Sequence, residues 1–135
     1  MKEYRNRGAG FIVVKNFGKT YKVLGLKINS KYDIPKGRCE ADDIDIFHTA
    51  VRECEEECSI IIKEKDVLFN FENKQIGPLT IFIAKTEQTP VVKVNVKSGI
   101  LEHDGYEWLD FDDLEKNAID YLVPGIIWAR NKLQY

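Results

Sequence analysis

An amphipathic segment from about residue 43 to residue 58 restricts the possible folds of this chain more than any other feature. Apolar side chains recur along it at the spacing of one face of an α-helix, at positions 47, 50, 51, 54 and 58. Glu53, Glu56 and Glu57 follow an i, i+3, i+4 spacing and therefore share the opposite face. The segment predicts a helix that packs against a core and presents carboxylates on its other side. Asp42 or Asp43 is expected to cap its start.

Local energetics oppose this grouping of carboxylates. Like charges at that spacing on a helix repel by about 0.2–0.5 kcal/mol per pair, and the C-terminal end of a helix is unfavourable for anions. A solvated acidic face is one interpretation, and a divalent cation that neutralises the charge is the other. The preceding stretch, Pro35, Lys36 and Gly37, favours the cation, because a glycine loop offers backbone N–H groups to phosphate oxygens that complete the coordination of Mg²⁺ or Mn²⁺.

Strand signals lie on both sides of the predicted helix. Two β-rich runs, 8–16 and 21–28, are separated by a turn signal and predict a hairpin. The remaining elements are strands at 66–73, 79–87 and 106–111, a loop at 32–43, a helical turn at 111–117 and a closing helix at 124–134 that starts at Pro124. This order predicts a layered α/β/α domain whose terminal helix covers the second face of the sheet.

Composition excludes several classes of protein. A chain of 135 residues with 44% hydrophobic side chains suits one compact domain over residues 1–135. The net charge is only −2, from 20 basic and 22 acidic residues, so no overall field favours nucleic acid or membranes. No stretch has the form of a signal peptide or a membrane span, and two of the three cysteines fall inside the predicted helix, which favours reduced thiols. We expect a cytoplasmic protein without a membrane partner.

Residues 37–60, GRCEADDIDIFHTAVRECEEECSI, resemble the Nudix box, G-x5-E-x7-R-E-U-x-E-E-x-G-U, where U is an apolar residue. The expected places are occupied by Gly37, Arg52, Glu53, Glu56, Glu57 and Ile60. The stretch RGAGFIVV at 7–14 is also similar to the family's first strand. The resemblance implies an α+β fold of the Nudix type, an α/β/α sandwich with a mixed β-sheet. It also implies an enzyme that hydrolyses phosphoric anhydrides.

Three departures from the box stand out. One extra residue lies between Gly37 and Arg52, which leaves Asp42 or Asp43 in place of the first glutamate. Cys54 takes an apolar position, which a buried thiol can fill. Ser59 stands where the box has glycine, and we expect it to strain the helix end.

The resemblance also implies roles for individual residues. Glu53, Glu56 and Glu57 are the implied ligands of Mg²⁺ or Mn²⁺, and Arg52 is the implied partner that fixes one of these carboxylates. Glu56 is a candidate general base, although family members differ over that residue. Lys36 and Gly37 are expected beside the substrate phosphates, and the alternative for Lys36 is an exposed loop lysine.

A second stretch, LEHDGYEWL at 101–109, is similar to a segment of the asymmetric dinucleoside tetraphosphate hydrolases of this family. It implies that Glu102 is an additional metal ligand or base. It also makes His103 a candidate for stabilising phosphate charge, against the alternative of a solvated loop histidine. Tyr32 and Phe71 are candidates for stacking a nucleobase, but Phe71 with Phe69 is equally typical of an ordinary core.

The expected substrate is a dinucleoside polyphosphate such as diadenosine tetraphosphate (Ap4A). Alternatives are ADP-ribose or a nucleotide sugar, the 5′ end of RNA, and a nucleoside triphosphate. A catalytically inactive domain that binds nucleotide as a sensor is the competing class. The sequence leaves open the leaving group, the general base, and the choice between a monomer and a homodimer.

Overall fold

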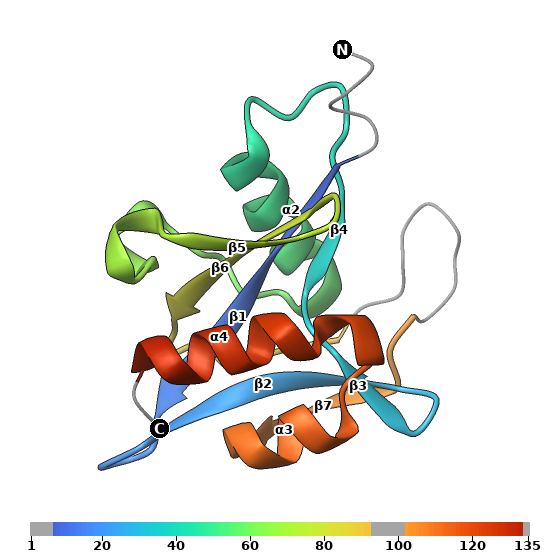
Figure 1. The fold of residues 1–135 in the computed structure, drawn as a ribbon. Helices are drawn as coiled ribbons and strands as arrows, with labels where there is room; N and C mark the ends of the chain where they lie inside the picture. The colour runs from blue at the N-terminus through green and yellow to red at the C-terminus, as the bar shows by residue number, and fades with distance from the viewer. Residues whose placement is uncertain (1–6, 93–101, 134–135) are drawn as a thin grey trace.

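A computed structural model describes residues 7–92 and 102–133 and shows a mixed β-sheet between layers of helices (Figure 1). The strands are β1 (Gly8–Asn16), β2 (Tyr21–Ile28), β3 (Lys31–Asp33), β4 (Lys36–Arg38), β5 (Asn73–Ile76), β6 (Leu79–Lys85) and β7 (Gly105–Leu109). The helices are α2 (Ile46–Cys58), α3 (Phe111–Asn117) and α4 (Val123–Leu133), with short 3₁₀ turns at 64–66, 69–71 and 120–122. None of the helices in these ranges has the length and apolarity needed to span a membrane.

Strand β1 is the centre of the sheet. It pairs antiparallel with β2, as the predicted hairpin requires, and parallel with β6, which makes the sheet mixed. The main path runs β3-β2-β1-β6-β5, with β4 paired to β1 and β7 paired to β2. The stretch at 32–43, predicted as a loop, thus contains the short strand β4 and the end of β3.

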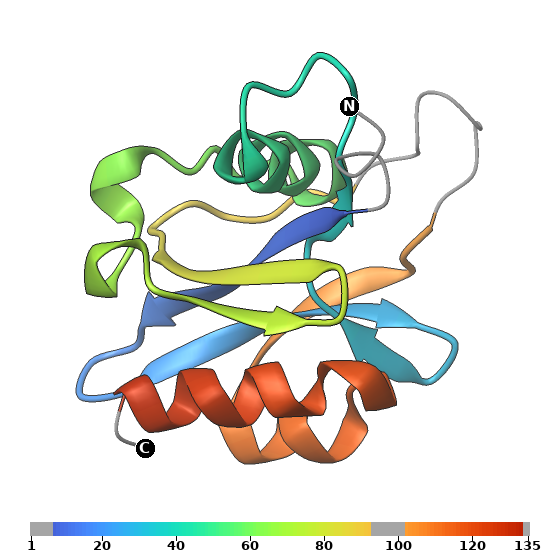
Figure 2. The ribbon, with the colours of Figure 1, turned by 45° about the horizontal axis from the view of Figure 1, so that its top comes forward.

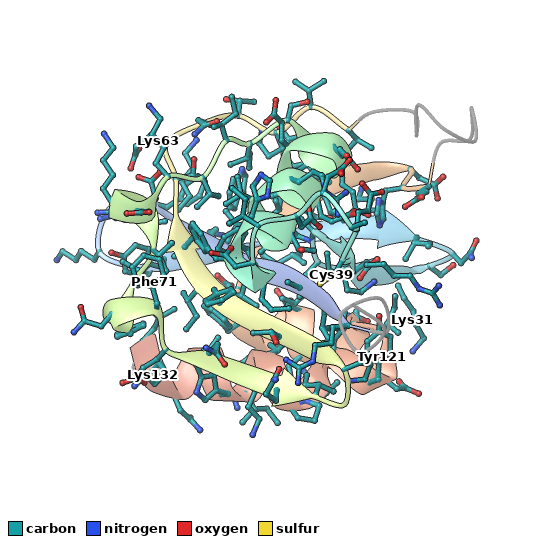
Figure 3. The ribbon with its side chains drawn as sticks, turned by 90° about the horizontal axis from the view of Figure 1, so that it is seen from above. Lys31, Cys39, Lys63, Phe71, Tyr121 and Lys132 are labelled. Carbon is teal, nitrogen blue, oxygen red and sulfur yellow. The ribbon has the colours of Figure 1, made fainter. Side chains whose placement is uncertain are left out.

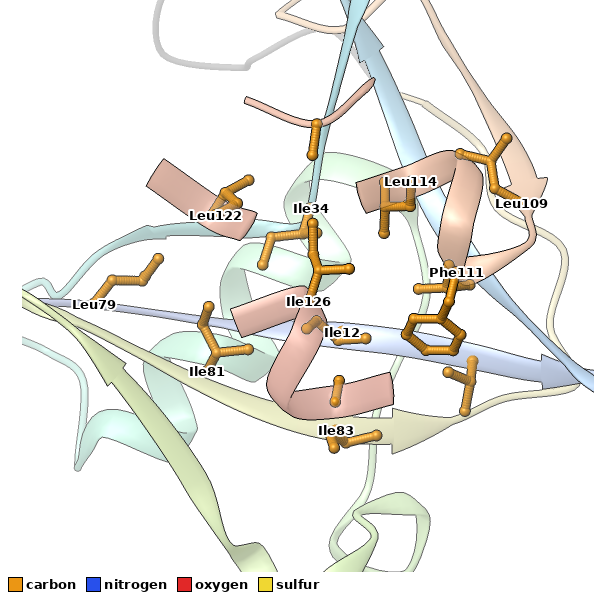
Figure 4. Packing of buried hydrophobic residues seen from close by; sticks show 14 residues of the cluster. Ile12, Ile34, Leu79, Ile81, Ile83, Leu109, Phe111, Leu114, Leu122 and Ile126 are labelled. Atoms are coloured by element: carbon orange, nitrogen blue, oxygen red, sulfur yellow. The ribbon is translucent and has the colours of Figure 1, made fainter. Parts of the chain in front are cut away.

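Side chains of β1 alternate between two cores because successive residues of a strand point to opposite faces of a sheet. Ile12 and Val14 belong to the cluster under α3 and α4 (Figure 4). Phe11 and Val13 belong to the cluster under α2, together with Cys54. Figure 2 shows α2 on one face of the sheet and α3 and α4 on the other. The predicted layers are confirmed, and the apolar face of α2 that includes Cys54 and Cys58 packs against the sheet.

The two ends of α2 are capped in different ways. Asp45 is the N-cap, and its carboxylate accepts a hydrogen bond from the His48 N–H at 2.7 Å. The prediction of Asp42 or Asp43 as the cap is wrong, because Asp43 binds Arg52 instead. Ser59 ends the helix with φ 65°, a left-handed conformation that glycine adopts more easily, as expected at this position of the box.

The strand predicted at 66–73 is wrong. Phe69, Asn70 and Phe71 form a 3₁₀ turn with positive φ angles of 58°, 54° and 63°, and β5 begins only at Asn73. Phe69 packs against the core under α4, whereas Phe71 is 40% exposed and touches Phe47 at a ring-centroid distance of 5.3 Å. The two phenylalanines therefore belong to a turn, in which the Phe69 ring packs against the core and the Phe71 ring is partly exposed.

Candidate active site

Strand β4 places the predicted phosphate loop against the carboxylate face of α2. The Lys36 backbone N–H donates a hydrogen bond to Glu57 Oε1 at 3.0 Å. A Cβ atom at Gly37 would lie 2.0 Å from Glu53 Cδ, so only glycine allows this close approach. The structure therefore brings Lys36 and Gly37 together with Glu53 and Glu57.

Arg52 connects the loop and the helix. Its Nε and Nη2 donate to the two oxygens of Asp43, each at 2.9 Å, and its Nη1 donates to Glu53 Oε2 at 2.9 Å. The same Nη1 lies 3.3 Å from both oxygens of Glu56. Arg52 thus forms a two-bond ion pair with Asp43 through Nε and Nη2, and it fixes the Glu53 carboxylate through Nη1.

Asp43, and not the exposed Asp42, takes the place of the first glutamate of the box. Its side chain is 2% exposed and also accepts hydrogen bonds from the Thr49 hydroxyl and the Glu40 N–H. Burial alone would raise the pKa of Asp43, but the hydrogen bonds from Arg52, Glu40 and Thr49 hold it far below its ordinary value. Because Asp43 lies at the standard spacing from Gly37, the extra residue lies between Asp43 and Arg52, a stretch that includes the 84% exposed Ile44.

A second chain segment reaches the same carboxylates just before β7. Ligand atoms of Glu57, Glu102 and His103 all lie within 4.8 Å of one another. Glu102 is exposed, but His103 is only 2% exposed and its Nε2 lies 3.0 Å from Asp33 Oδ2. The alternative of a solvated histidine is therefore wrong, while a phosphate contact of His103 stays a prediction. Leu101 of the predicted segment lies outside the described residues.

The carboxylates of α2 are crowded and partly buried. Burial raises the pKa of Glu57 to about 9, with repulsion from Asp33 and Glu53 in addition, although the Lys36 N–H opposes the shift. Burial also raises the pKa of Glu53 to about 7 against the opposing effect of Arg52. A cation among these oxygens would favour their ionised forms. The donor set, hard carboxylate oxygens with room for phosphate beside them, fits Mg²⁺ or Mn²⁺.

The metal-free protein is expected to lose stability as the pH rises. Glu53 and Glu57 have higher pKa values in the folded chain than their ordinary value of 4.5, so the folded state binds more protons than the unfolded state between about pH 4.5 and 9. Their contribution is complete below pH 4.5 and is lost as the pH rises through the folded pKa values. In urea titrations with EDTA, we expect the free energy of unfolding to fall by several kcal/mol between pH 5 and 9. The double variant Glu53→Gln, Glu57→Gln should lack most of this fall, and an equal fall in both proteins would contradict the assignment.

Gly37→Ala is expected to fold but to bind Mn²⁺ at least about tenfold more weakly. The added Cβ collides with the end of a flexible side chain, so the Glu53 carboxylate can move away, but it then leaves the candidate cation site. Calorimetric titration with Mn²⁺ measures this loss. The control is Gly77→Ala, at a residue with φ 57° and open space around it, which should cost about 1 kcal/mol of stability without weakening Mn²⁺ binding. Equal Mn²⁺ affinity in Gly37→Ala and the wild type would contradict the role of Gly37.

Tyr32 and Phe71, the two residues predicted to stack a nucleobase, lie in different parts of the molecule. Tyr32 lies near the loop, where its hydroxyl donates to Glu107 at 2.7 Å and its ring packs against the core under α3 and α4. The Lys36 Nζ lies 5.7 Å from the ring centroid of Tyr121, which is 49% exposed. Figure 3 shows Phe71 on the side of the molecule opposite Tyr121, so the structure does not bring Phe71 to this site. Tyr121 and Asp33 lie beside Lys36 but belong to no motif in the sequence.

The profile of the NUDIX domain matches residues 4–125 of the chain. The chain belongs to the NUDIX family. No curated protein matches it in sequence. Many solved structures share its fold, and three of them illustrate the range of proteins. The binary complex of a C. elegans Ap4A hydrolase is 16% identical, with a TM-score of 0.73, and the match covers 95% of this chain and 97% of that one.

The other two structures come from bacteria. The dihydroneopterin triphosphate pyrophosphohydrolase of E. coli is 17% identical, with a TM-score of 0.66 over 93% of this chain and 94% of that one. The NUDIX domain of Shewanella oneidensis NrtR, in complex with ADP ribose, is 16% identical, with a TM-score of 0.62 over 93% and 86%. These likenesses establish the fold and do not select a substrate. Membership of the NUDIX family supports a hydrolase that acts on pyrophosphate bonds, and NUDIX hydrolases generally use divalent metal ions.

Proposed function

We propose that this NUDIX protein is a Mg²⁺- or Mn²⁺-dependent hydrolase that cleaves a pyrophosphate bond in a nucleoside diphosphate linked to another group. Dinucleoside polyphosphates such as Ap4A are the expected substrates. The observation that carries the proposal is the convergence of Glu53 and Glu57 on the Lys36–Gly37 loop, with Glu102 from a distant segment beside Glu57. Within the described residues, this arrangement puts candidate cation ligands next to a loop suited to phosphate.

Each residue of the candidate site has a separate role in this proposal. Glu53, Glu56, Glu57 and Glu102 would hold the cation, which when bound neutralises the charge of the phosphates and activates a water molecule. Arg52 orients the Glu53 carboxylate through Nη1, and its own position is fixed by Asp43. The absence of a side chain at Gly37 lets the loop backbone approach the Glu53 carboxylate. Lys36, whose side chain is 19% exposed, keeps a positive charge at the edge of the loop.

Two carboxylates are candidates for the general base. Glu56 has a side chain that is 51% exposed, and Glu102 is exposed as well. A base with access to solvent can take a proton from the attacking water and release it to bulk water. Glu57 is less suited because its carboxylate accepts the Lys36 N–H and is crowded by Asp33 and Glu53.

The choice of substrate rests on two likenesses. The 101–109 segment is similar to that of the dinucleoside tetraphosphate hydrolases, and the C. elegans Ap4A hydrolase shares the fold. ADP-ribose, nucleotide sugars, RNA 5′ ends and nucleoside triphosphates are the alternatives. The sensor class draws support from the NrtR domain, whose structure contains ADP ribose. The complete group of Arg52, Glu53, Glu56 and Glu57 favours catalysis, because nucleotide binding alone has little need of it.

A substrate panel in ¹⁸O-labelled water tests the proposal. Ap4A, ADP-ribose, a nucleotide sugar, 5′-triphosphorylated RNA and a nucleoside triphosphate are each incubated with Mg²⁺ or Mn²⁺, and products are identified by mass. We expect Ap4A to yield ATP and AMP, with the label in one product and no reaction in EDTA. The Glu56→Gln variant should be strongly impaired. If wild type and variant are equally inert but bind nucleotide, the protein is a sensor.

A further inference from the structure

Asp33, at the end of β3, is a buried carboxylate next to the candidate cation site. It is 5% exposed, and its Oδ1 accepts a hydrogen bond from the Ile34 N–H at 2.8 Å. The Lys36 Nζ lies 3.3 Å from Oδ1 and 3.4 Å from Oδ2, and the His103 Nε2 lies 3.0 Å from Oδ2. A buried carboxylate needs such partners, because burial of an unpaired charge is unfavourable.

Lys36 and His103, the two charged or titratable partners of Asp33, are each connected to an implied cation ligand. The backbone N–H of Lys36 donates to Glu57 Oε1 at 3.0 Å. His103 follows Glu102 in the chain, and the ligand atoms of Glu57, Glu102 and His103 are within 4.8 Å of one another. Asp33 therefore lies behind the cluster and joins the β3–β4 segment to the segment before β7.

This connection gives His103 a role other than contact with substrate. Its ring is 2% exposed, and one nitrogen already faces Asp33. Residue 102 is the first residue described before β7, so the pair of His103 and Asp33 anchors the chain where it delivers Glu102. When Glu57 and Glu102 are both ionised, as ligands of a cation would be, their like charges repel at this distance, and a fixed backbone is needed to hold them together.

We propose that Asp33 is a positioning residue that, through Lys36 and His103, holds Glu57 and Glu102 in one cation site. The proposal rests on the function proposed above. Groups that orient metal ligands typically change metal affinity by about 10- to 100-fold when removed. Asp33 acts through its two partners and contacts neither substrate nor cation.

Calorimetric titration with Mn²⁺ alone tests the proposal without a substrate. Asp33→Ala should raise the dissociation constant by about 10- to 100-fold, and the isosteric Asp33→Asn by a smaller factor. His103→Leu should match Asp33→Ala. His103→Gln, whose amide nitrogen can take the place of Nε2, should stay within about threefold of the wild type. The control Asp66→Ala removes a carboxylate that accepts the Lys63 N–H at 2.9 Å outside the site, and it should bind Mn²⁺ normally.

A wild-type affinity in Asp33→Ala and Asp33→Asn would overturn the proposal. Equal losses in His103→Gln and His103→Leu would also overturn it, because the imidazole itself would then be required. If Asp33→Ala fails to unfold cooperatively, the Asp33→Asn and His103 variants decide. A wild-type protein without Mn²⁺ binding would overturn the proposed function as well, whereas normal wild-type binding with unaffected variants would overturn only the role of Asp33.

Discussion

Glu57→Gln is expected to lower kcat by about a thousandfold, equivalent to about 4 kcal/mol of transition-state stabilisation. Glutamine keeps the size of the side chain and can still accept the Lys36 N–H, but it removes the negative charge that the cation requires. The same change should stabilise the metal-free protein, by on the order of 2 kcal/mol at pH 9, because an ionised carboxylate no longer has to be buried. Steady-state kinetics on the substrate identified by the panel and urea titration in EDTA measure the two effects.

Glu55→Gln is the matched control for this prediction. Glu55 lies on the same helix two residues earlier, is exposed, and belongs to no contact of the candidate site within the described residues. It should leave both kcat and stability close to those of the wild type. A loss of activity in Glu55→Gln equal to that in Glu57→Gln would show that general helix charge, and not a specific ligand position, controls the reaction.

Asp43→Ala is expected to destabilise the protein by about 3–5 kcal/mol, because it removes one partner of a buried ion pair and leaves the other uncompensated. Arg52 loses both of its 2.9 Å bonds to Asp43, and the Thr49 hydroxyl and the Glu40 N–H lose their acceptor. Activity should also fall, since Arg52 then no longer holds Glu53 in a fixed direction. Urea unfolding at pH 7 measures the loss of stability.

Asp42→Ala tests whether this effect belongs to one position. Asp42 is the exposed neighbour of Asp43 and lies one residue before the place of the first glutamate as counted from Gly37. Its replacement should change stability by less than about 0.5 kcal/mol, as is usual for an exposed side chain. Similar losses in the two variants would contradict the assignment of the acidic position to Asp43.

The layers of the fold and the carboxylate face could be predicted because both follow from local periodicity. The stripe that includes Cys54 and Cys58 had to face a core, and this placed Glu53 and Glu57 on the other side. The long motif then fixed where Gly37 and Arg52 stand relative to these carboxylates. The extra residue before Arg52 left both Asp42 and Asp43 as candidates for the acidic position, and the folded loop shows that Asp43 binds Arg52.

Other features depend on contacts that spacing does not contain. The 69–71 turn uses left-handed backbone at two phenylalanines, which lack the usual glycine signal for such a conformation, so their alternation indicated a strand. Asp33 is separated from His103 by 70 positions in the chain, and no local pattern links them. His103 is buried at the same long-range contact with Asp33, which explains why the alternative of a solvated loop histidine is wrong.

Anomalous diffraction from crystals grown with Mn²⁺ and a non-hydrolysable dinucleoside polyphosphate is the most direct test of the cation site. We predict a manganese peak bound by carboxylates among Glu53, Glu56 and Glu57, next to the phosphates at the Lys36–Gly37 loop. Crystals that contain the nucleotide but show no manganese at these side chains would contradict a metal-dependent active site on α2.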